Sequence, residues 1–154
     1  EQLKRKLDRT TAGRGNSVIA PPIVELDDGR YFGFIKAVAI DLLPPTLVVD
    51  LAEFFTGEEA DQARARDGSP GEDLDYYIRN VNPLLRQLKM ALSVQITLST
   101  WDRHNIPDPK KVDLATFERI FSATKPWEQN VVRNGYWITV TGGRVVELEE
   151  QYVP

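Results

Sequence analysis

YWITVTGGRVVELEE, residues 136–150, alternates apolar and polar side chains on both sides of a Gly-Gly pair. Two alternating runs around two glycines predict a β-hairpin, because the turn between the strands needs residues that tolerate positive φ. A three-residue loop with a glycine bulge would place Ile138 opposite Leu148 and Val140 opposite Val146. We therefore expect the chain to contain an antiparallel sheet that ends in this hairpin.

The register of the hairpin decides which of its side chains share a face. A strict two-residue turn would pair Ile138 with Glu147 and mix apolar with acidic residues on each face, so we prefer the bulged register. Its apolar face would hold Tyr136, Ile138, Val140, Val146 and Leu148. Its other face would carry Thr139, Thr141, Glu147, Glu149 and Trp137. A tryptophan among polar side chains is a candidate contact residue.

The chain of 154 residues has the composition of a globular domain, with 42% hydrophobic and 27% charged residues. We expect a basic N-terminal segment or linker over residues 1–20 and a single β-rich domain over residues 21–154. No apolar run approaches the roughly 20 residues that a membrane-spanning helix needs. The absence of cysteine excludes disulfides, thiolate metal sites and a cysteine nucleophile.

The net charge of −4 is unevenly distributed along the sequence. Residues 1–14 carry a balance of +3, which leaves −7 for the remaining 140 residues. An acidic body repels phosphate groups, so nucleic acid is not an expected partner. The basic start would be a solvated tail, or an arm that contacts a membrane surface or another protein.

The first half of the domain contains signals for three consecutive strands. Residues 23–26 and 30–41 would form a hairpin around Asp28-Gly29, and residues 46–51 would be the third strand. Gly33 inside the second strand indicates a bulge or the close approach of another backbone.

The second half alternates strands with two helices. Thr56 and Glu59 match a capping box before a helix over residues 57–66, and Asp113 would cap a second helix that Pro126 ends. Strands are expected within residues 75–83, 84–90 and 94–101, and a linker over 127–134. This order predicts an α+β fold, mainly antiparallel, in which a small curled sheet or OB-like barrel carries two short helices.

Catalytic motifs are scarce in this sequence. The single histidine, His104, lies in a proline-bounded loop, and no nucleophile, phosphate-binding or zinc motif accompanies it. A small hydrolase that uses Glu147, Glu149 or Asp75 is one alternative function. The acidic residues between Glu53 and Asp75 are typical of a solvated helix and loop; a calcium site is the alternative, but its spacing matches no EF-hand.

Amphipathic aromatic residues and their polar neighbours favour binding over catalysis. Such side chains line grooves that recognise peptides or sugars, although aromatic residues in strands also pack in cores. The candidate binding residues are Tyr76, Tyr77, Arg79, Asn80, Asn82, Trp137, Glu149 and Tyr152. No cofactor, metal site or catalytic residue is assigned.

Several strings of the sequence resemble an uncharacterised family of actinobacterial exported proteins and lipoproteins. The strings are Asp28-Gly29-Arg30-x-Phe32-Gly33-x-Ile35, Asp50-Leu51-Ala52, Thr56-Gly57-Glu58-x-Ala60, Asp75-Tyr76-Tyr77-Ile78-x-Asn80, Tyr136-Trp137 and Glu149-Glu150-Gln151-Tyr152-x-Pro154. The resemblance covers residues 28–154 and implies an envelope location, with anchoring through a segment that precedes Glu1, but no activity. Arg103-His104 stands where the family often has a cysteine pair, which excludes a disulfide or redox role there.

We therefore expect a non-enzymatic binding domain of the cell envelope or extracellular space, with a protein or polysaccharide partner. The contact face would lie around Tyr76–Asn82 and Trp137. Besides the hydrolase, an accessory subunit that docks onto a larger assembly is an alternative, as is a cytoplasmic location.

Overall fold

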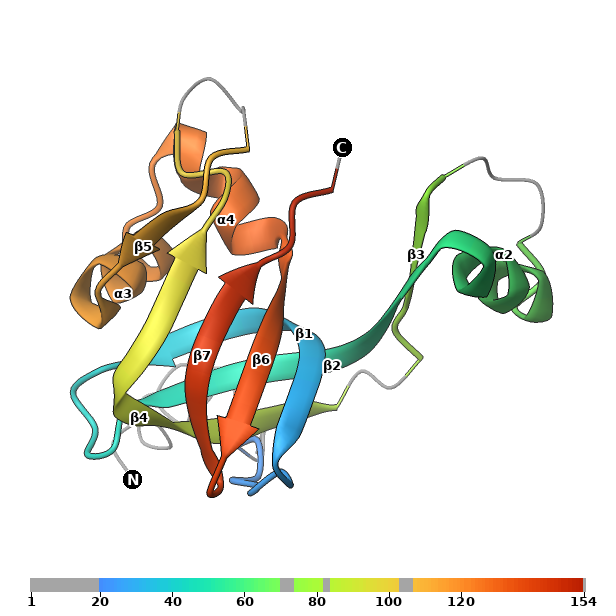
Figure 1. The fold of residues 1–154 in the computed structure, drawn as a ribbon. Helices are drawn as coiled ribbons and strands as arrows, with labels where there is room; N and C mark the ends of the chain where they lie inside the picture. The colour runs from blue at the N-terminus through green and yellow to red at the C-terminus, as the bar shows by residue number, and fades with distance from the viewer. Residues whose placement is uncertain (1–19, 70–73, 82–83, 103–106, 154) are drawn as a thin grey trace, which may run out of the picture.

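The computed structural model describes residues 20–69, 74–81, 84–102 and 107–153, and its centre is a closed barrel of five strands (Figure 1). The barrel strands are β1 (Gly29–Ala39), β2 (Thr46–Thr56), β4 (Leu85–Leu98), β6 (Gly135–Thr141) and β7 (Arg144–Glu150). The smaller elements are β3 (Tyr76–Arg79), β5 (Lys110–Val112), α2 (Gly57–Arg66), α3 (Leu114–Ser122), the 3-10 helix η1 (Pro126–Glu128) and α4 (Gln129–Arg133). None of the described helices is long and apolar enough to cross a membrane.

The strand order is that of an OB-like barrel, one of the two architectures that the sequence predicted. β1 pairs antiparallel with β2 and with β6, β2 pairs with β4, and β6 pairs with β7. The barrel closes where β4 and β7 run parallel, and α3 lies between the third and fourth barrel strands in the chain. The expected α+β class is thus confirmed, and the described residues contain three α-helices where the sequence predicted two.

Alternating side chains of the barrel strands fill its interior. Leu47, Ile96, Ile138 and Leu148 come from four different strands and are almost completely buried. α3 begins where Asp113 accepts a hydrogen bond from the Thr116 amide at 2.8 Å, as its capping signal predicted. Its apolar stripe then packs on the barrel and closes that side of the core.

The end of β2 leaves the barrel and forms an arm with α2 and β3 (Figure 1). We call α2, β3 and residues 53–56 of β2 the arm. β3 pairs with β2 from Glu53 to Thr56, while β4 pairs with β2 only as far as Asp50. The arm therefore continues a barrel strand beyond the point where the barrel closes.

Gly33 marks a close approach between two backbones, one of the two features that its position predicted. A Cβ atom there would lie 2.8 Å from the carbonyl oxygen of Asp50 on β2. The irregularity of β1 occurs a little later, between Ile35 and Ala37. Only glycine lets β1 and β2 meet this closely.

The closing hairpin has the expected faces, except that Val145 takes the place of Val146, and it has a different turn. Gly142 and Gly143, both with positive φ, form a two-residue turn, and the extra residue is taken up within β7. Ile138 pairs with Leu148 as predicted, whereas Val140 pairs with Val145. The prediction for Val146 was wrong, because a bulge inside the strand restores the alternation one residue later.

The predicted hairpin around Asp28-Gly29 is not formed. β6 occupies the edge of β1 from Gly29 onward, so the preceding residues pair elsewhere. Ile23 forms a parallel bridge with Gln87 of β4, and the Asp28 carboxylate accepts a hydrogen bond from the Gly142 amide at 2.8 Å. The Asp-Gly pair thus supports the closing hairpin and does not make a turn of its own.

Three further local predictions were wrong in detail. β4 is a single strand over the region expected to hold two, and the expected linker over residues 127–134 contains η1 and α4. The Thr56 side chain makes no capping hydrogen bond at the start of α2, although the helix itself is confirmed. These differences depend on strand pairing and on ion pairs between elements, which local periodicity does not contain.

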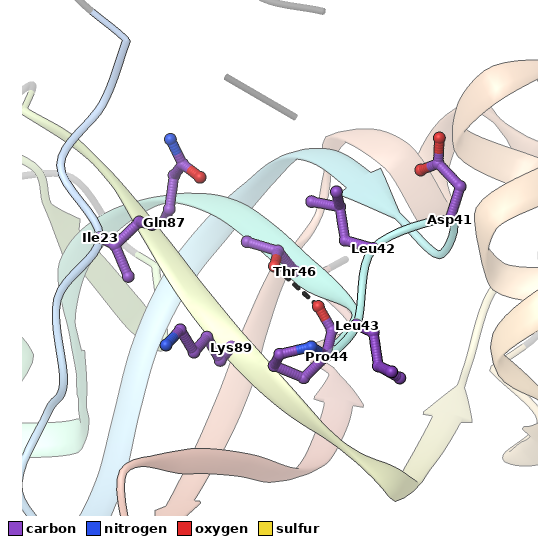
Figure 2. A pocket seen from close by; sticks show the side chains of 8 residues that line it. All are labelled: Ile23, Asp41, Leu42, Leu43, Pro44, Thr46, Gln87 and Lys89. Atoms are coloured by element: carbon purple, nitrogen blue, oxygen red, sulfur yellow. Dashed lines mark hydrogen bonds between the residues drawn. The ribbon is translucent and has the colours of Figure 1, made fainter. Parts of the chain in front are cut away.

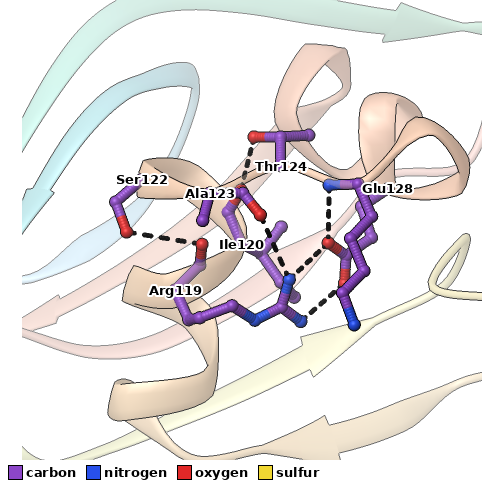
Figure 3. Close-up of polar contacts among 7 residues, drawn as sticks. Arg119, Ile120, Ser122, Ala123, Thr124 and Glu128 are labelled. Atoms are coloured by element: carbon purple, nitrogen blue, oxygen red, sulfur yellow. Dashed lines mark hydrogen bonds and ion pairs between the residues drawn. The ribbon is translucent and has the colours of Figure 1, made fainter.

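A polar cluster at the end of α3 explains why the chain folds back there (Figure 3). The buried carboxylate of Glu128 accepts hydrogen bonds from Arg119 Nη1 at 2.5 Å and Nη2 at 2.7 Å. The backbone amide of Lys125 donates a third hydrogen bond to it at 3.0 Å. η1 is thereby fixed against the last turn of α3, and α4 follows directly.

Candidate functional site

A hollow of about 470 Å³ lies between the barrel and the arm. Trp137 of β6 and Arg30 of β1 contribute from the barrel wall, and Phe54 and Glu59 contribute from the arm. Residues at the end of β7 and beyond it, including Glu149 and Tyr152, complete the lining. We call this the Trp137 hollow; it brings together three of the predicted binding residues, Trp137, Glu149 and Tyr152.

The indole of Trp137 is held by an aromatic cluster and remains partly exposed. Its ring centroid lies 5.1 Å from that of Phe32 and 5.8 Å from that of Phe54, both in edge-to-face geometry. Its Nε1 donates a hydrogen bond to Gln151 Oε1 at 2.9 Å. Tyr76 stacks on Phe54 at 5.9 Å, so this predicted residue supports the hollow through Phe54.

A glycine behind this cluster was not recognised in the sequence. A Cβ atom on Gly135 would lie 2.1 Å from the Phe32 ring, so the ring rests directly on the backbone of β6. Phe32 is buried there and in turn packs against Trp137. Gly135 is the first residue of β6 and has no positive φ, so only the packing reveals its role.

A guanidinium group covers the indole of Trp137. Arg30 Cζ lies 4.2 Å from the ring centroid, and Arg30 Nη2 lies 3.0 Å from Glu149 Oε1. The side chains of Arg30 and Glu149 are each 52% exposed, so this ion pair is in contact with solvent. The arrangement combines a cation–π contact with an exposed salt bridge.

Glu150 has a structural role at the base of the hollow. It is buried, and its carboxylate accepts hydrogen bonds from the amides of Ser99 and Thr100, the Thr100 hydroxyl and Asn134 Nδ2, at 2.5–3.1 Å. These donors satisfy the buried charge and fix the chain after β4 against β7. Burial, assisted by the charge of Glu150, also raises the pKa of Tyr136 well above its ordinary value.

The other predicted residues of β3 serve the arm itself. Tyr77 Oη and Arg79 Nε both donate hydrogen bonds to Asp67 Oδ2 at 2.8 Å, on the side of β3 opposite Tyr76. These donors lower the pKa of the Asp67 carboxyl. Asn80 donates to Asp50 Oδ2 at 2.8 Å, and Asn82 lies outside the described residues. The predicted contact face is therefore divided between the hollow and the internal contacts of the arm.

A second hollow, of about 450 Å³, lies beside the loop between β1 and β2 (Figure 2). OB-like barrels commonly bind oligonucleotides and oligosaccharides near this loop. Here the lining is mainly aliphatic, and Leu43 is 88% exposed. Among the described residues that line it, none is aromatic and Lys89 is the only basic one. The described lining thus differs from the aromatic stacking platform and basic groove of single-strand nucleic-acid binders.

The carboxylates considered for a hydrolase do not form an enclosed pair. Glu147, Glu149 and Asp75 are all exposed, and only Glu149 lines the Trp137 hollow. In the part of the chain that the structure describes, no group of three or more acidic or histidine side chains could hold a metal ion. His104 lies outside that part.

Comparisons of the chain with models of protein families, with curated proteins and with solved structures gave no match. The geometry of the hollow and the composition of its lining therefore carry the functional argument.

Proposed function

We propose that the chain is a non-enzymatic binding domain of the cell envelope or extracellular space and that the Trp137 hollow is its contact face. The observation that carries this proposal is the partly exposed indole of Trp137 on an otherwise polar strand face, within a hollow between barrel and arm. Binding sites typically combine a few aromatic side chains with polar groups that fix the orientation of the ligand. The partner would be a protein or a polysaccharide of the envelope.

Two further arguments support this proposal. An OB-like barrel is a rigid scaffold on which many different ligands are recognised, so the fold is compatible with binding but does not name a ligand. The envelope location follows from the resemblance of residues 28–154 to exported actinobacterial proteins and lipoproteins. Anchoring through a segment that precedes Glu1 belongs to the same proposal.

An accessory subunit is the second candidate function, and the aliphatic surface beside the β1–β2 loop favours it. Ile23 is 54% exposed and lies in the same hollow as Leu43. Exposed apolar side chains that cluster in this way are typical of protein interfaces. Both candidates describe a chain that acts by contact with a partner.

A tryptophan exchange tests the contact face. We expect Trp137→Phe to weaken retention on purified envelope polysaccharide or envelope protein about tenfold, because the smaller phenyl ring offers less contact area and no indole N–H. Trp101→Phe is the matched control, since Trp101 also lies under a cation, Lys110 at 4.3 Å, but not in the hollow. Unchanged retention of the Trp137 variant, with a lowered thermal midpoint, would show that Trp137 serves only packing.

A further inference from the structure

The Trp137 hollow already contains one cation of its own chain. Arg30 lies over the indole at 4.2 Å and pairs with Glu149 at 3.0 Å, so a guanidinium fits the space between a ring face and a carboxylate. Aromatic faces carry negative electrostatic potential and attract cations. The geometry of this internal contact shows which chemical group the hollow can hold.

The charges of the hollow also favour a cation. Among the described residues, three carboxylates, those of Glu59, Glu149 and Glu150, line it together with one guanidinium. Glu150 is satisfied by its own donors, whereas Glu149 is half exposed and Glu59 is exposed on the arm. Glu59 and Glu149 would repel a carboxylate or phosphate ligand. A neutral sugar ring could not stack on the indole while Arg30 covers it.

We propose that the hollow recognises an arginine side chain of a basic protein segment, which takes the place of Arg30 over Trp137 and pairs with Glu149 and Glu59. This inference rests on the proposed binding function and names its ligand chemistry. The exchange is nearly neutral for the domain, because an exposed ion pair contributes little net stability and Arg30 can be solvated when it leaves. The acidic body of the domain, at −7 outside residues 1–14, would attract such a segment over longer distances.

Peptide titrations test the inference. The probe is a tetra-arginine amide, with tetraglutamine amide as the neutral control. Tryptophan fluorescence is followed in a Trp101→Phe/Trp127→Phe background, so that the signal comes from Trp137. We expect saturable binding of the arginine peptide that weakens with added salt, and none of the glutamine peptide.

Replacement of Arg30 should change the affinity for the arginine peptide in one direction if the inference is right and in the other if it is wrong. If Arg30 occupies the ligand's place, Arg30→Ala should tighten peptide binding about three- to tenfold, because the internal cation no longer competes. Arg30→Gln, which keeps most of the side-chain stem, should tighten it less and serves if the alanine variant is unstable. Arg144→Ala removes the same charge from the exposed turn end of β7 and should change binding little.

The role of Glu149 is tested in the Arg30→Ala background, where its internal partner is absent. Glu149→Gln should then weaken peptide binding about threefold, whereas Glu147→Gln, an exposed neighbour on the same strand, should not. Weaker binding by Arg30→Ala, or equal binding of the glutamine peptide, overturns the inference. If retention on envelope material depends on Trp137 but the arginine peptide does not compete with it, the inference is also overturned, and the proposed function still stands. Loss of both peptide binding and retention contradicts both proposals.

Discussion

Glu128 illustrates how single residues hold buried charge in this fold. Its side chain is 6% exposed, and its carboxylate accepts two hydrogen bonds from Arg119, whose side chain is 39% exposed. The Arg119 guanidinium lowers the pKa of Glu128 from its ordinary value of 4.5, an effect that outweighs the opposing effect of burial. The folded state therefore stabilises the ionised form of Glu128.

Replacing Glu128 by glutamine should lower the free energy of unfolding by about 1–3 kcal/mol at pH 7, because two charge-assisted hydrogen bonds are weakened. Since the folded pKa lies below the unfolded one, the stabilisation is complete above pH 4.5 and is lost as the pH falls through the lowered pKa. Urea unfolding of both proteins should therefore show a difference that shrinks in acid. Glu118→Gln on α3, beside Arg119, is the control, and a difference independent of pH would contradict this explanation.

Gly135 supports the binding face without contacting the hollow. Gly135→Ala should destabilise the fold by about 1–3 kcal/mol, because the added methyl group forces the Phe32 ring away from β6. Phe32→Leu should recover part of that loss, and a double-mutant cycle by thermal unfolding would measure the coupling. Gly29→Ala is the matched control in the neighbouring strand, since a Cβ there meets its nearest atom at an ordinary 3.7 Å. Additive effects of the Gly135 and Phe32 exchanges would show that the ring is not what the methyl group displaces.

At the level of elements, the alternation of side chains and the helix-capping residues predicted the features that depend on neighbouring residues alone. The faces of β6 and β7, the start of α3 and the close approach at Gly33 follow from period, capping and backbone sterics. The pairing partner of residues 23–24 and the bulge within β7 could not be predicted in this way. Strand pairing depends on which sheet edges other segments already occupy.

The candidate site was predictable only in part for the same reason. Trp137, Glu149 and Tyr152 reach the hollow because the strand period and the chain direction place them there. Arg30 and Glu59 were not predicted, since they arrive from β1 and from the arm. Tyr77 and Arg79 looked like contact residues, but their polar groups are used by Asp67, twelve residues before Arg79 in the chain. An ion pair between elements carries no periodic signal.

At the level of the whole molecule, the barrel and the arm are stabilised by different interactions. Apolar side chains from all five barrel strands fill one core with α3. The arm depends more on polar contacts: buried Arg64 of α2 donates to the carbonyl oxygens of Leu74 and Tyr76 at 3.1 and 2.8 Å, and Asp67 binds Tyr77 and Arg79. We infer that the arm opens locally at a lower free energy than the barrel unfolds.

Local opening of the arm would also take apart the Trp137 hollow, because Phe54, Thr56 and Glu59 belong to the arm (Figure 1). Asp67→Asn should therefore speed amide exchange over residues 57–66 and 76–79 at neutral pH and leave β6 protected.

In the wild type the same opening of the arm should appear in acid. Arg79 and Tyr77 lower the pKa of Asp67 from 3.8. The stabilisation that Asp67 provides is therefore complete above pH 3.8 and is lost as the pH falls through the lowered pKa. Hydrogen exchange read by mass spectrometry makes the measurement, with exposed Glu58→Gln on α2 as the control. Uniformly faster exchange in β6 and the arm would mean that barrel and arm unfold as one unit, and binding at the hollow would then be as resistant to acid as the barrel itself.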